Sequence, residues 1–347
     1  MRAVPGISEE MLSIEEIESA WRRSEPVVLA DPVSRRAPLP FQATFYPMGF
    51  PVEVTTNSRQ VLDGAARSWA RFKRMFDTQP VQMRVAVTRG GSTECPAAPV
   101  CRGQHNLLAH IADSENFAMC DLAQGFCFLS LTQAAVEHEE YLRFYFLEAT
   151  ALCQIATRYV TPIHAACVAL NGSGILLCGD SGAGKSTLAY ACARAGWTYI
   201  TDDASYLINH RDDLTVVGNC SRARFRPSAA EIFPELQGGE VTQRGETGKP
   251  SIELSTPAFR NIVRSHTSKV DYVVFLNRRD VEHPVLGPFS KEIARYFMQQ
   301  PLFSMPEMMT TQDGMIDRLL SAPVLELRYT DLNWAIGRLS RLVREGE

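Results

Sequence analysis

The spacing of apolar residues in the first half of the chain predicts a mixture of strands and helices. Strands are expected where apolar and polar residues alternate, at 41–47, 52–55, 81–87, 116–119 and 125–131. Apolar residues at helical spacing predict helices at 13–22, 59–76 and 141–159, with a proline-rich linker at 31–40. We therefore expect residues 1–155 to form an N-terminal mixed α+β module. Substrate or partner recognition is a role left open for it.

The second half has the pattern of an α/β domain, expected over residues 156–347. A short apolar strand at 175–178 leads through a glycine-rich loop into a helix over 186–195. The strand before it, residues 162–170, carries His164 and is joined to the loop strand by a hairpin turn at 171–174. Further elements are expected at 198–201, 206–208, 216–217, 270–276, 324–327 and 332–344. The sheet should contain both parallel and antiparallel pairs.

The glycine-rich loop is the most specific signal in the chain. Its residues are Gly179, Asp180, Ser181, Gly182, Ala183, Gly184, Lys185, Ser186 and Thr187. Glycines let consecutive backbone N–H groups converge on phosphate oxygens, Lys185 adds a point charge, and Ser186 offers a hydroxyl to Mg²⁺. The loop therefore predicts ATP and Mg²⁺ as ligands. It does not encode the base, so GTP or a pyrophosphate donor stays open.

Two adjacent carboxylates follow the strand that comes after the loop helix. Asp202 and Asp203 stand at the carboxyl end of that strand, where side chains can reach phosphates bound by the neighbouring loop. One carboxylate can ligate Mg²⁺ and the other can accept the proton of an attacking hydroxyl. His164 is expected near the γ-phosphate region because its strand pairs with the loop strand. A structural acidic turn and a core histidine are the competing interpretations.

Composition excludes several classes of protein. The chain has 347 residues, 45% of them apolar, and a formal net charge of −4, with no clustered basic patch for nucleic acid. It has no apolar stretch of membrane-spanning length, and the first 25 residues include Glu9, Glu10, Glu15, Glu16 and Glu18 where a secretion signal needs an apolar block, so a cytoplasmic protein is expected. Nine cysteines favour free thiols over a disulfide framework, and Cys95 and Cys101 are expected in a surface loop without metal.

Residues 164–203 closely resemble the catalytic domain of HPr kinase/phosphorylase, a bacterial serine kinase whose fold is related to phosphoenolpyruvate carboxykinase. The shared features are the His-Ala entry, the Gly-Asp-Ser-Gly-x-Gly-Lys-Ser loop and the Thr-Asp-Asp strand end. The resemblance implies a P-loop kinase fold in which Asp203 accepts the proton of the substrate hydroxyl and Lys185 binds the β- and γ-phosphates. It further implies that Ser186 holds Mg²⁺ and that His164 supports catalysis. Since Asp203 is then the base, Asp202 is the carboxylate of the pair that we expect at the metal.

The chain departs from that family at two places. Thr187 stands where the family usually has Glu, and the family's Glu-Ile-Arg-Gly-Leu-Gly signature is absent. Residues 222–227 occupy its place, so we expect a kinase without phosphorylase activity. A replacement metal ligand could come from Glu231, Glu235 or Glu253. Basic side chains that could neutralise the transferred phosphoryl group are Arg222, Arg224, Arg226 and Lys249.

The organisation of the chain resembles a divergent HPr-kinase-related group that includes lasso-peptide precursor kinases. The expected activity is ATP- and Mg²⁺-dependent transfer of phosphate to a hydroxyl, most readily a serine of a peptide or small protein. The alternatives are a small-molecule kinase with the same site and a non-catalytic protein that ATP regulates. Neither a nucleic acid nor a membrane is expected as a partner, and a homo-oligomer stays open.

Overall fold

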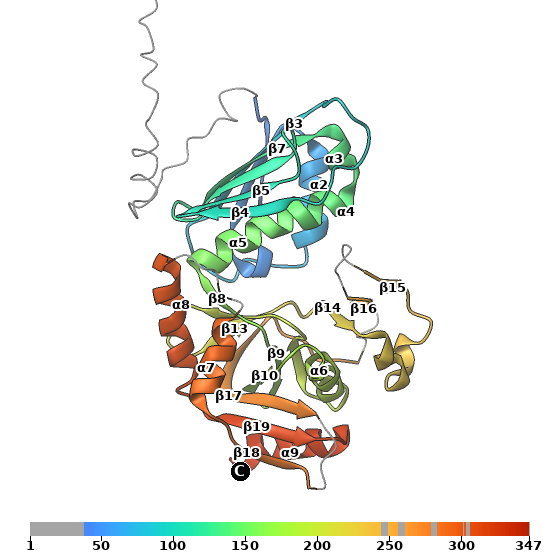
Figure 1. The fold of residues 1–347 in the computed structure, drawn as a ribbon, viewed down its shortest axis with the longest axis vertical. Helices are drawn as coiled ribbons and strands as arrows, with labels where there is room; N and C mark the ends of the chain where they lie inside the picture. Colours follow the sequence, from blue (N-terminus) through green and yellow to red (C-terminus); the bar gives the residue numbers. More distant parts are fainter. Residues whose placement is uncertain are drawn as a thin grey trace, which may run out of the picture.

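The computed structural model describes residues 38–243, 249–255, 261–278, 283–300, 302 and 306–346. The helix expected at 13–22 and most of the linker expected at 31–40 lie outside these ranges. Figure 1 shows two large sheets, one from each half of the chain, with a smaller sheet beside the second. Among the helices described, none has the length and apolar character needed to cross a bilayer. All nine cysteines are free thiols, as expected.

The first sheet has seven strands in the order β1-β2-β3-β7-β6-β5-β4. Strands β2, β3 and β7 are parallel, and the other pairs are antiparallel. The bounds are β1 (Phe41–Phe45), β2 (Val52–Thr56), β3 (Val81–Thr88), β4 (Val100–Gln104), β5 (Leu107–Ile111), β6 (Phe117–Asp121) and β7 (Phe126–Thr132). Cys101 therefore lies in a strand, β4, and not in the surface loop that the sequence predicted.

Helices pack against one face of this sheet and bury its larger apolar cluster. They are η1 (Pro47–Gly49), α2 (Arg59–Trp69), α3 (Gln133–Glu137), α4 (Glu139–Tyr141), the π-helical η2 (Leu142–Glu148) and α5 (Ala149–Arg158). Helix α2 ends seven residues before the predicted end at residue 76. The backbone N–H groups of Met75 and Phe76 instead donate to the carbonyl oxygen of Gly49, so tertiary hydrogen bonds replace those of a continued helix.

The second sheet has nine strands, with β11-β9-β10-β17-β13-β12-β8 in order and β19 and β18 extending from β17. Strands β10, β17 and β19 are parallel neighbours. The bounds are β8 (Val160–Ile163), β9 (Ala166–Leu170), β10 (Ser173–Cys178), β11 (Thr198–Thr201), β12 (Ser205–Ile208), β13 (Thr215–Val217), β17 (Thr267–Arg278), β18 (Val285–Pro288) and β19 (Val324–Tyr329).

Helices cover both faces of the second sheet, and a separate apolar cluster lies under each pair. One face carries α6 (Lys185–Arg194) and α9 (Leu332–Glu345), and the other carries α7 (Lys291–Gln299) and α8 (Pro306–Leu319). The small sheet contains β14 (Arg222–Phe225), β15 (Val241–Thr242) and β16 (Ser251–Ser255), with η3 (Pro227–Glu231) and η4 (Pro234–Leu236) between β14 and β15. This mixed α/β architecture agrees with the predicted fold class.

The strand predicted over 162–170 is two strands with a bend at His164 and Ala165. Strand β8 pairs with β12, whereas β9 pairs with β10 and β11. The bend is held by the N–H of Ala165, which donates to the carbonyl oxygen of Ile163 at 2.8 Å. The hairpin between β9 and β10 is as predicted, because Asn171 and Gly172 both have positive φ, the geometry that its Asn-Gly sequence favours.

The two large sheets are joined by direct packing. Helix α5 leads into β8 with one residue between them, and the core of the first half continues onto the second half through Val160, Ile208, Val217 and Met308. Phe50 of the first half stacks on Tyr159, with ring centroids 5.3 Å apart. The end of α2 and the start of α5 are thereby held next to the edge of the second sheet where the glycine-rich loop lies.

Candidate active site

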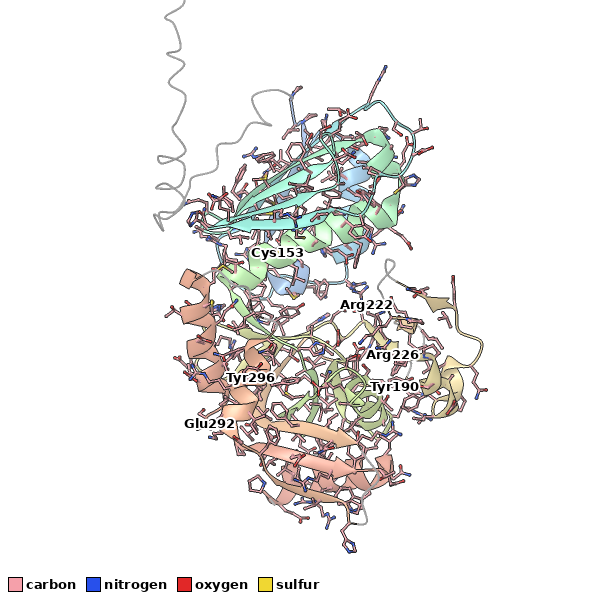
Figure 2. The ribbon with its side chains drawn as sticks, viewed as in Figure 1. Cys153, Tyr190, Arg222, Arg226, Glu292 and Tyr296 are labelled. Atoms are coloured by element: carbon pink, nitrogen blue, oxygen red, sulfur yellow. The ribbon has the colours of Figure 1, made fainter. Side chains whose placement is uncertain are left out.

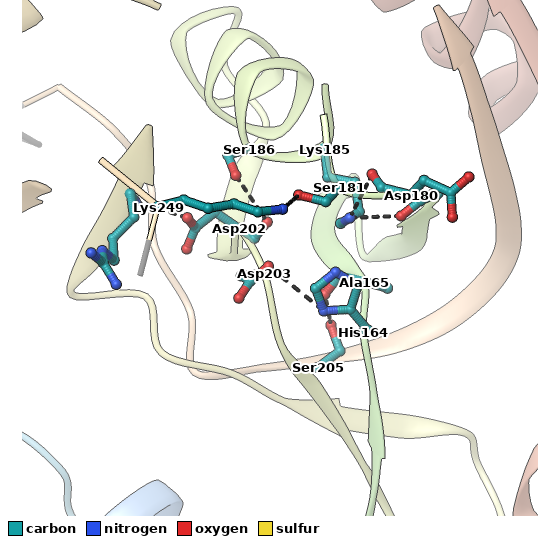
Figure 3. A network of polar contacts seen from close by, with 12 residues as sticks. His164, Ala165, Asp180, Ser181, Lys185, Ser186, Asp202, Asp203, Ser205 and Lys249 are labelled. Carbon is teal, nitrogen blue, oxygen red and sulfur yellow. Dashed lines mark hydrogen bonds and ion pairs between the residues drawn. The ribbon is translucent and has the colours of Figure 1, made fainter. Parts of the chain in front are cut away.

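The glycine-rich loop connects the buried strand β10 to the N-terminus of α6. Gly179, Gly182 and Gly184 have positive φ, and a Cβ on Gly179 would lie 2.9 Å from the Cβ of Ala183. The loop conformation therefore requires glycine at its first position. The buried Lys185 donates from Nζ to the carbonyl oxygens of Gly179 and Asp180, at 2.7 and 3.2 Å (Figure 3). Burial lowers the pKa of Lys185.

Asp202 and Asp203 follow β11 and lie in different environments. Asp202 is buried, and its Oδ2 accepts a hydrogen bond from the backbone N–H of Arg224 at 2.8 Å. Burial raises the pKa of Asp202 to about 6. The side chain of Asp203 is 67% exposed, and its Oδ1 lies 3.7 Å from Nδ1 of His164. Both carboxylates line the same cavity; that of Asp203 is open to it, while that of Asp202 is also held by a backbone N–H group of the protein.

His164 occupies the bend between β8 and β9, which directs its side chain toward Asp203 (Figure 3). Ser205 supports the bend because its hydroxyl donates to the carbonyl oxygen of Ala165 at 3.0 Å. Burial and the nearby positive charge of Lys185 lower the pKa of His164, and Asp203 opposes them. The imidazole is therefore neutral near pH 7 and can take part in hydrogen bonds both as donor and as acceptor.

His164, Lys185, Asp202 and Asp203 border one cavity of about 840 Å³. Its walls come from both halves of the chain: the loop, His164 and both aspartates on one side, and residues of η1, α2, η2 and α5 on the other. The first-half residues are Pro47, Met48, Ser68, Trp69, Arg71, Phe72, Glu148, Ala151, Leu152 and Ile155. No sequence pattern predicted this wall, because these residues approach the loop only through the packing of the two halves.

The predicted basic residues also line the cavity. Arg222, Arg224 and Arg226 lie along β14 and just beyond it, and Lys249 donates from Nζ to the hydroxyl of Ser181 at 2.8 Å. Arg226 donates to the same hydroxyl at 3.4 Å. Arg226, just after β14, and Lys249, just before β16, thus reach the phosphate loop from the small sheet. Arg278, at the end of β17, lines the cavity as well and was not predicted.

The three glutamates that the sequence offered as candidate metal ligands have different surroundings in the structure. Glu231 lines the cavity. Glu235 instead accepts a hydrogen bond from the hydroxyl of Tyr190 at 2.8 Å and lies 3.7 Å from Arg194. Glu253 faces Arg224 across β14 and β16, with Nε and Oε2 3.9 Å apart. Of the three, Glu231 is therefore the carboxylate with access to a ligand in the cavity.

The site has donors that suit a magnesium ion held mainly by phosphate. Within the described ranges, no cluster of three or more His, Cys, Asp or Glu side chains could hold a metal by itself. Mg²⁺ commonly uses one or two carboxylates together with substrate phosphates and water. The hydroxyl of Ser186 lies 3.4 Å from the carbonyl oxygen of Asp202, and both residues line the cavity. A hydroxyl and a carboxylate beside a phosphate loop fit that kind of site.

A central segment of the chain is similar to a known family. Residues 155–226 match the model described as HPr Serine kinase C-terminal domain. A similar solved structure is the Hpr(Ser) kinase/phosphatase from Coxiella burnetii, with 14% identity, a TM-score of 0.31, and coverage of 54% of this chain and 99% of that one. A search of curated proteins gives no match. The matched segment contains the loop, His164 and both aspartates, which confirms the family resemblance expected from the sequence.

Proposed function

We propose that this protein is a kinase that transfers the γ-phosphate of ATP to a hydroxyl, most readily a serine of a peptide or small protein. The observation that carries the proposal is the meeting of a phosphate-binding loop and an exposed carboxylate, Asp203, on one cavity. The match of residues 155–226 to the HPr serine kinase C-terminal domain supports phosphotransferase chemistry in general. Within this proposal, residues 156–347 would catalyse the transfer, and residues 1–155 would help to select the acceptor.

The loop would bind the triphosphate through its backbone N–H groups and through Lys185. The lysine already points into the loop, where it donates to two carbonyl oxygens, and a bound phosphate would take part of that coordination. Its positive charge, and those of Lys249 and Arg226 beside Ser181, would stabilise charge on the transferring group. Ser186 and Asp202 are the residues that would hold Mg²⁺, which when bound neutralises charge on the phosphate oxygens.

Asp203 would act as the proton acceptor. The hydroxyl oxygen of the substrate would form a bond to the γ-phosphorus. The bond from that phosphorus to the bridging β–γ oxygen would break, and ADP would leave. The hydroxyl proton passes to the carboxylate of Asp203. The neutral His164, 3.7 Å from that carboxylate, would orient it. Positioning and electrostatics supply most of the catalysis in such a reaction, so no covalent enzyme intermediate is required.

The test is transfer of label from γ-labelled ATP to candidate peptides and proteins encoded beside this gene, with Mg²⁺ or with EDTA. We expect label and a phosphate mass shift on a serine, with transfer abolished by EDTA. Ser186→Ala should raise the Mg²⁺ concentration needed for half-maximal transfer. Tight ATP binding without transfer to any acceptor would overturn the kinase proposal and would favour a protein that ATP regulates without catalysis.

A further inference from the structure

Two arginines from opposite halves of the chain face the same cavity. Arg71 lies in the short turn that follows α2, and Arg222 is the first residue of β14. Both line the cavity, and Figure 2 shows Arg222 on the side of the second half that faces the first. Neither belongs to the phosphate loop or to the contacts around Ser181. They form a second group of positive charge, on the part of the wall supplied partly by the first half.

The acidic residues near these arginines already have cationic partners. Glu148 lies 3.5 Å from Nη2 of Arg143, and its Oε1 accepts a hydrogen bond from the hydroxyl of Ser68 at 2.8 Å. Glu253 lies 3.9 Å from Nε of Arg224. The two carboxylates pair directly with Arg143 and Arg224, and their charges also act on Arg71 and raise its pKa. Among the described residues, no direct ion pair joins a carboxylate to the guanidinium of Arg71 or Arg222.

The like charges of Arg71 and Arg222 affect each other. Burial is the largest cause that lowers the pKa of Arg71, and the positive charge of Arg222 lowers it further. The Arg71 side chain is nevertheless exposed to the cavity, so a ligand can reach it. The charges of Glu148 and Glu253 offset part of this repulsion. An anion bound between the two guanidinium groups would offset more of it, because it would contact both directly. Guanidinium groups are well suited to carboxylates and phosphates because they donate in a planar fork.

Apolar side chains exposed in the same cavity favour a peptide ligand. Leu152 of α5 is 37% exposed and Ile232, just after η3, is 36% exposed, and both line the cavity. A ligand that covers them needs an apolar group in addition to its charge. Peptide side chains supply both kinds of group within a few residues, whereas a small polar metabolite does not.

We infer that the acceptor is an acidic peptide segment whose carboxylate or phosphate binds between Arg71 and Arg222, while its hydroxyl lies at Asp203. This inference deepens the proposed function and rests on it for the role of the hydroxyl. The anion site can be tested without phosphoryl transfer. Residues 1–155 would then contribute directly to specificity, through Arg71.

The experiment measures peptide binding and phosphoryl transfer separately, on the full chain with Mg²⁺. Three peptide pools share a central serine flanked by random apolar residues, and carry either aspartate, phosphothreonine or asparagine at the remaining positions. Retention on the protein with ADP is measured by mass spectrometry, and transfer is measured with γ-labelled ATP. We expect wild type to retain one or both anionic pools at least about tenfold better than the asparagine pool, as charge-assisted contacts from two guanidinium groups should give. The two anionic pools distinguish carboxylate from phosphate.

Two variants and a matched control assign the preference to the site. Arg71→Gln and Arg222→Gln should each reduce the preference to below about threefold, since each removes one of the charges. Arg74→Gln is the control, because Arg74 lies three residues from Arg71 but pairs with Asp77 and is outside the cavity lining. Thermal melting without ligand checks that each variant is folded. Equal retention of all three pools by wild type, or an unchanged preference in both folded variants, overturns the inference.

The two readouts separate this inference from the proposed function. Retention of anionic peptides that depends on Arg71 and Arg222, without transfer, would support the anion site and would count against the kinase. Transfer to all pools alike would support the kinase and overturn the anion site.

Discussion

Two aspartates at strand ends, one in each half of the molecule, have opposite surroundings. Asp121 ends β6 and is buried, and its Oδ1 accepts hydrogen bonds from Asn106 Nδ2 at 2.7 Å and from the backbone N–H groups of Ala123 and Gln124 at 3.1 Å. Asp203 follows β11, is exposed, and has His164 at 3.7 Å. One carboxylate is fully used by the fold, and the other remains accessible to a ligand. Because the residue type is the same, the hydrogen bonds that each carboxylate already makes distinguish a structural aspartate from a candidate catalytic one.

The same contrast holds for the two halves as wholes. In the first half, several buried polar side chains bond to one another, as with Asn116, which bonds to Asp113 and to both the backbone and the hydroxyl of Thr132. The second half leaves cations and a carboxylate exposed along the cavity. The first half therefore supplies one wall of the cavity, and the second half supplies most of its charged groups. Arg71 is the exception that connects the two roles.

Breaking the packing between the halves should have the largest effect on stability. Phe50 is fully buried and stacks on both Phe76 and Tyr159, with centroids 4.4 and 5.3 Å apart. Phe50→Ala should lower the free energy of unfolding by about 3–5 kcal/mol, because it leaves a cavity between the halves. Urea denaturation measures the change. A loss below about 1 kcal/mol would mean that the halves are held together elsewhere.

Removing the lysine of the glycine-rich loop should weaken ATP binding by the second half and leave its fold intact. Lys185→Met should weaken ATP binding by about 10- to 150-fold, the effect of losing a charged hydrogen-bond donor to phosphate. Calorimetric titration with ATP gives the dissociation constant. Lys269→Met is the matched control, since that exposed lysine lies 3.5 Å from Asp271 and is outside the cavity lining. Equal affinities in the two variants would remove Lys185 from the nucleotide site.

Asp121→Ala should show the reverse behaviour. It leaves the amide of Asn106 and two backbone N–H groups without their acceptor in a buried turn, so the free energy of unfolding should fall by about 1–3 kcal/mol. ATP binding by the folded protein should not change. Urea denaturation and ATP titration on the same sample test both statements. A stable variant that no longer binds ATP would contradict the division of roles between the halves.

A smaller effect is expected on the pH dependence of stability, through His110 of the first half. Burial lowers the pKa of His110, whose Nε2 has no hydrogen-bond partner among the described residues. As pH falls below about 6.5, the unfolded chain takes up this proton first, so stability should fall by at most about 1.4 kcal/mol per pH unit. His110→Gln should remove this part of the slope between pH 7.5 and 5. An identical pH dependence in wild type and variant would show that His110 does not contribute.

Local sequence signals predicted the phosphate loop and the hairpin before it, because glycine positions and apolar runs depend on neighbours along the chain. They also located the carboxylates at the end of β11. Helix α2 was predicted too long because Phe72 and Phe76 keep helical spacing while the backbone turns away to bond Gly49. The bend at His164 was missed because β8 pairs with β12 and β9 pairs with β11, and these pairings are not visible in the local sequence. Arg71 was missed because only tertiary packing brings it to the cavity.

The most direct test of the central claim compares Asp203→Asn with wild type in a single turnover with bound ATP and a phosphorylatable acceptor. Asp212→Asn is the control, because Asp212 is an exposed carboxylate that pairs with Arg318 away from the cavity. The account predicts unchanged ATP affinity and a transfer rate about 10²- to 10⁴-fold lower in Asp203→Asn, the usual contribution of a general base. Asp212→Asn should behave as wild type. A transfer rate in Asp203→Asn equal to that of wild type would contradict the account.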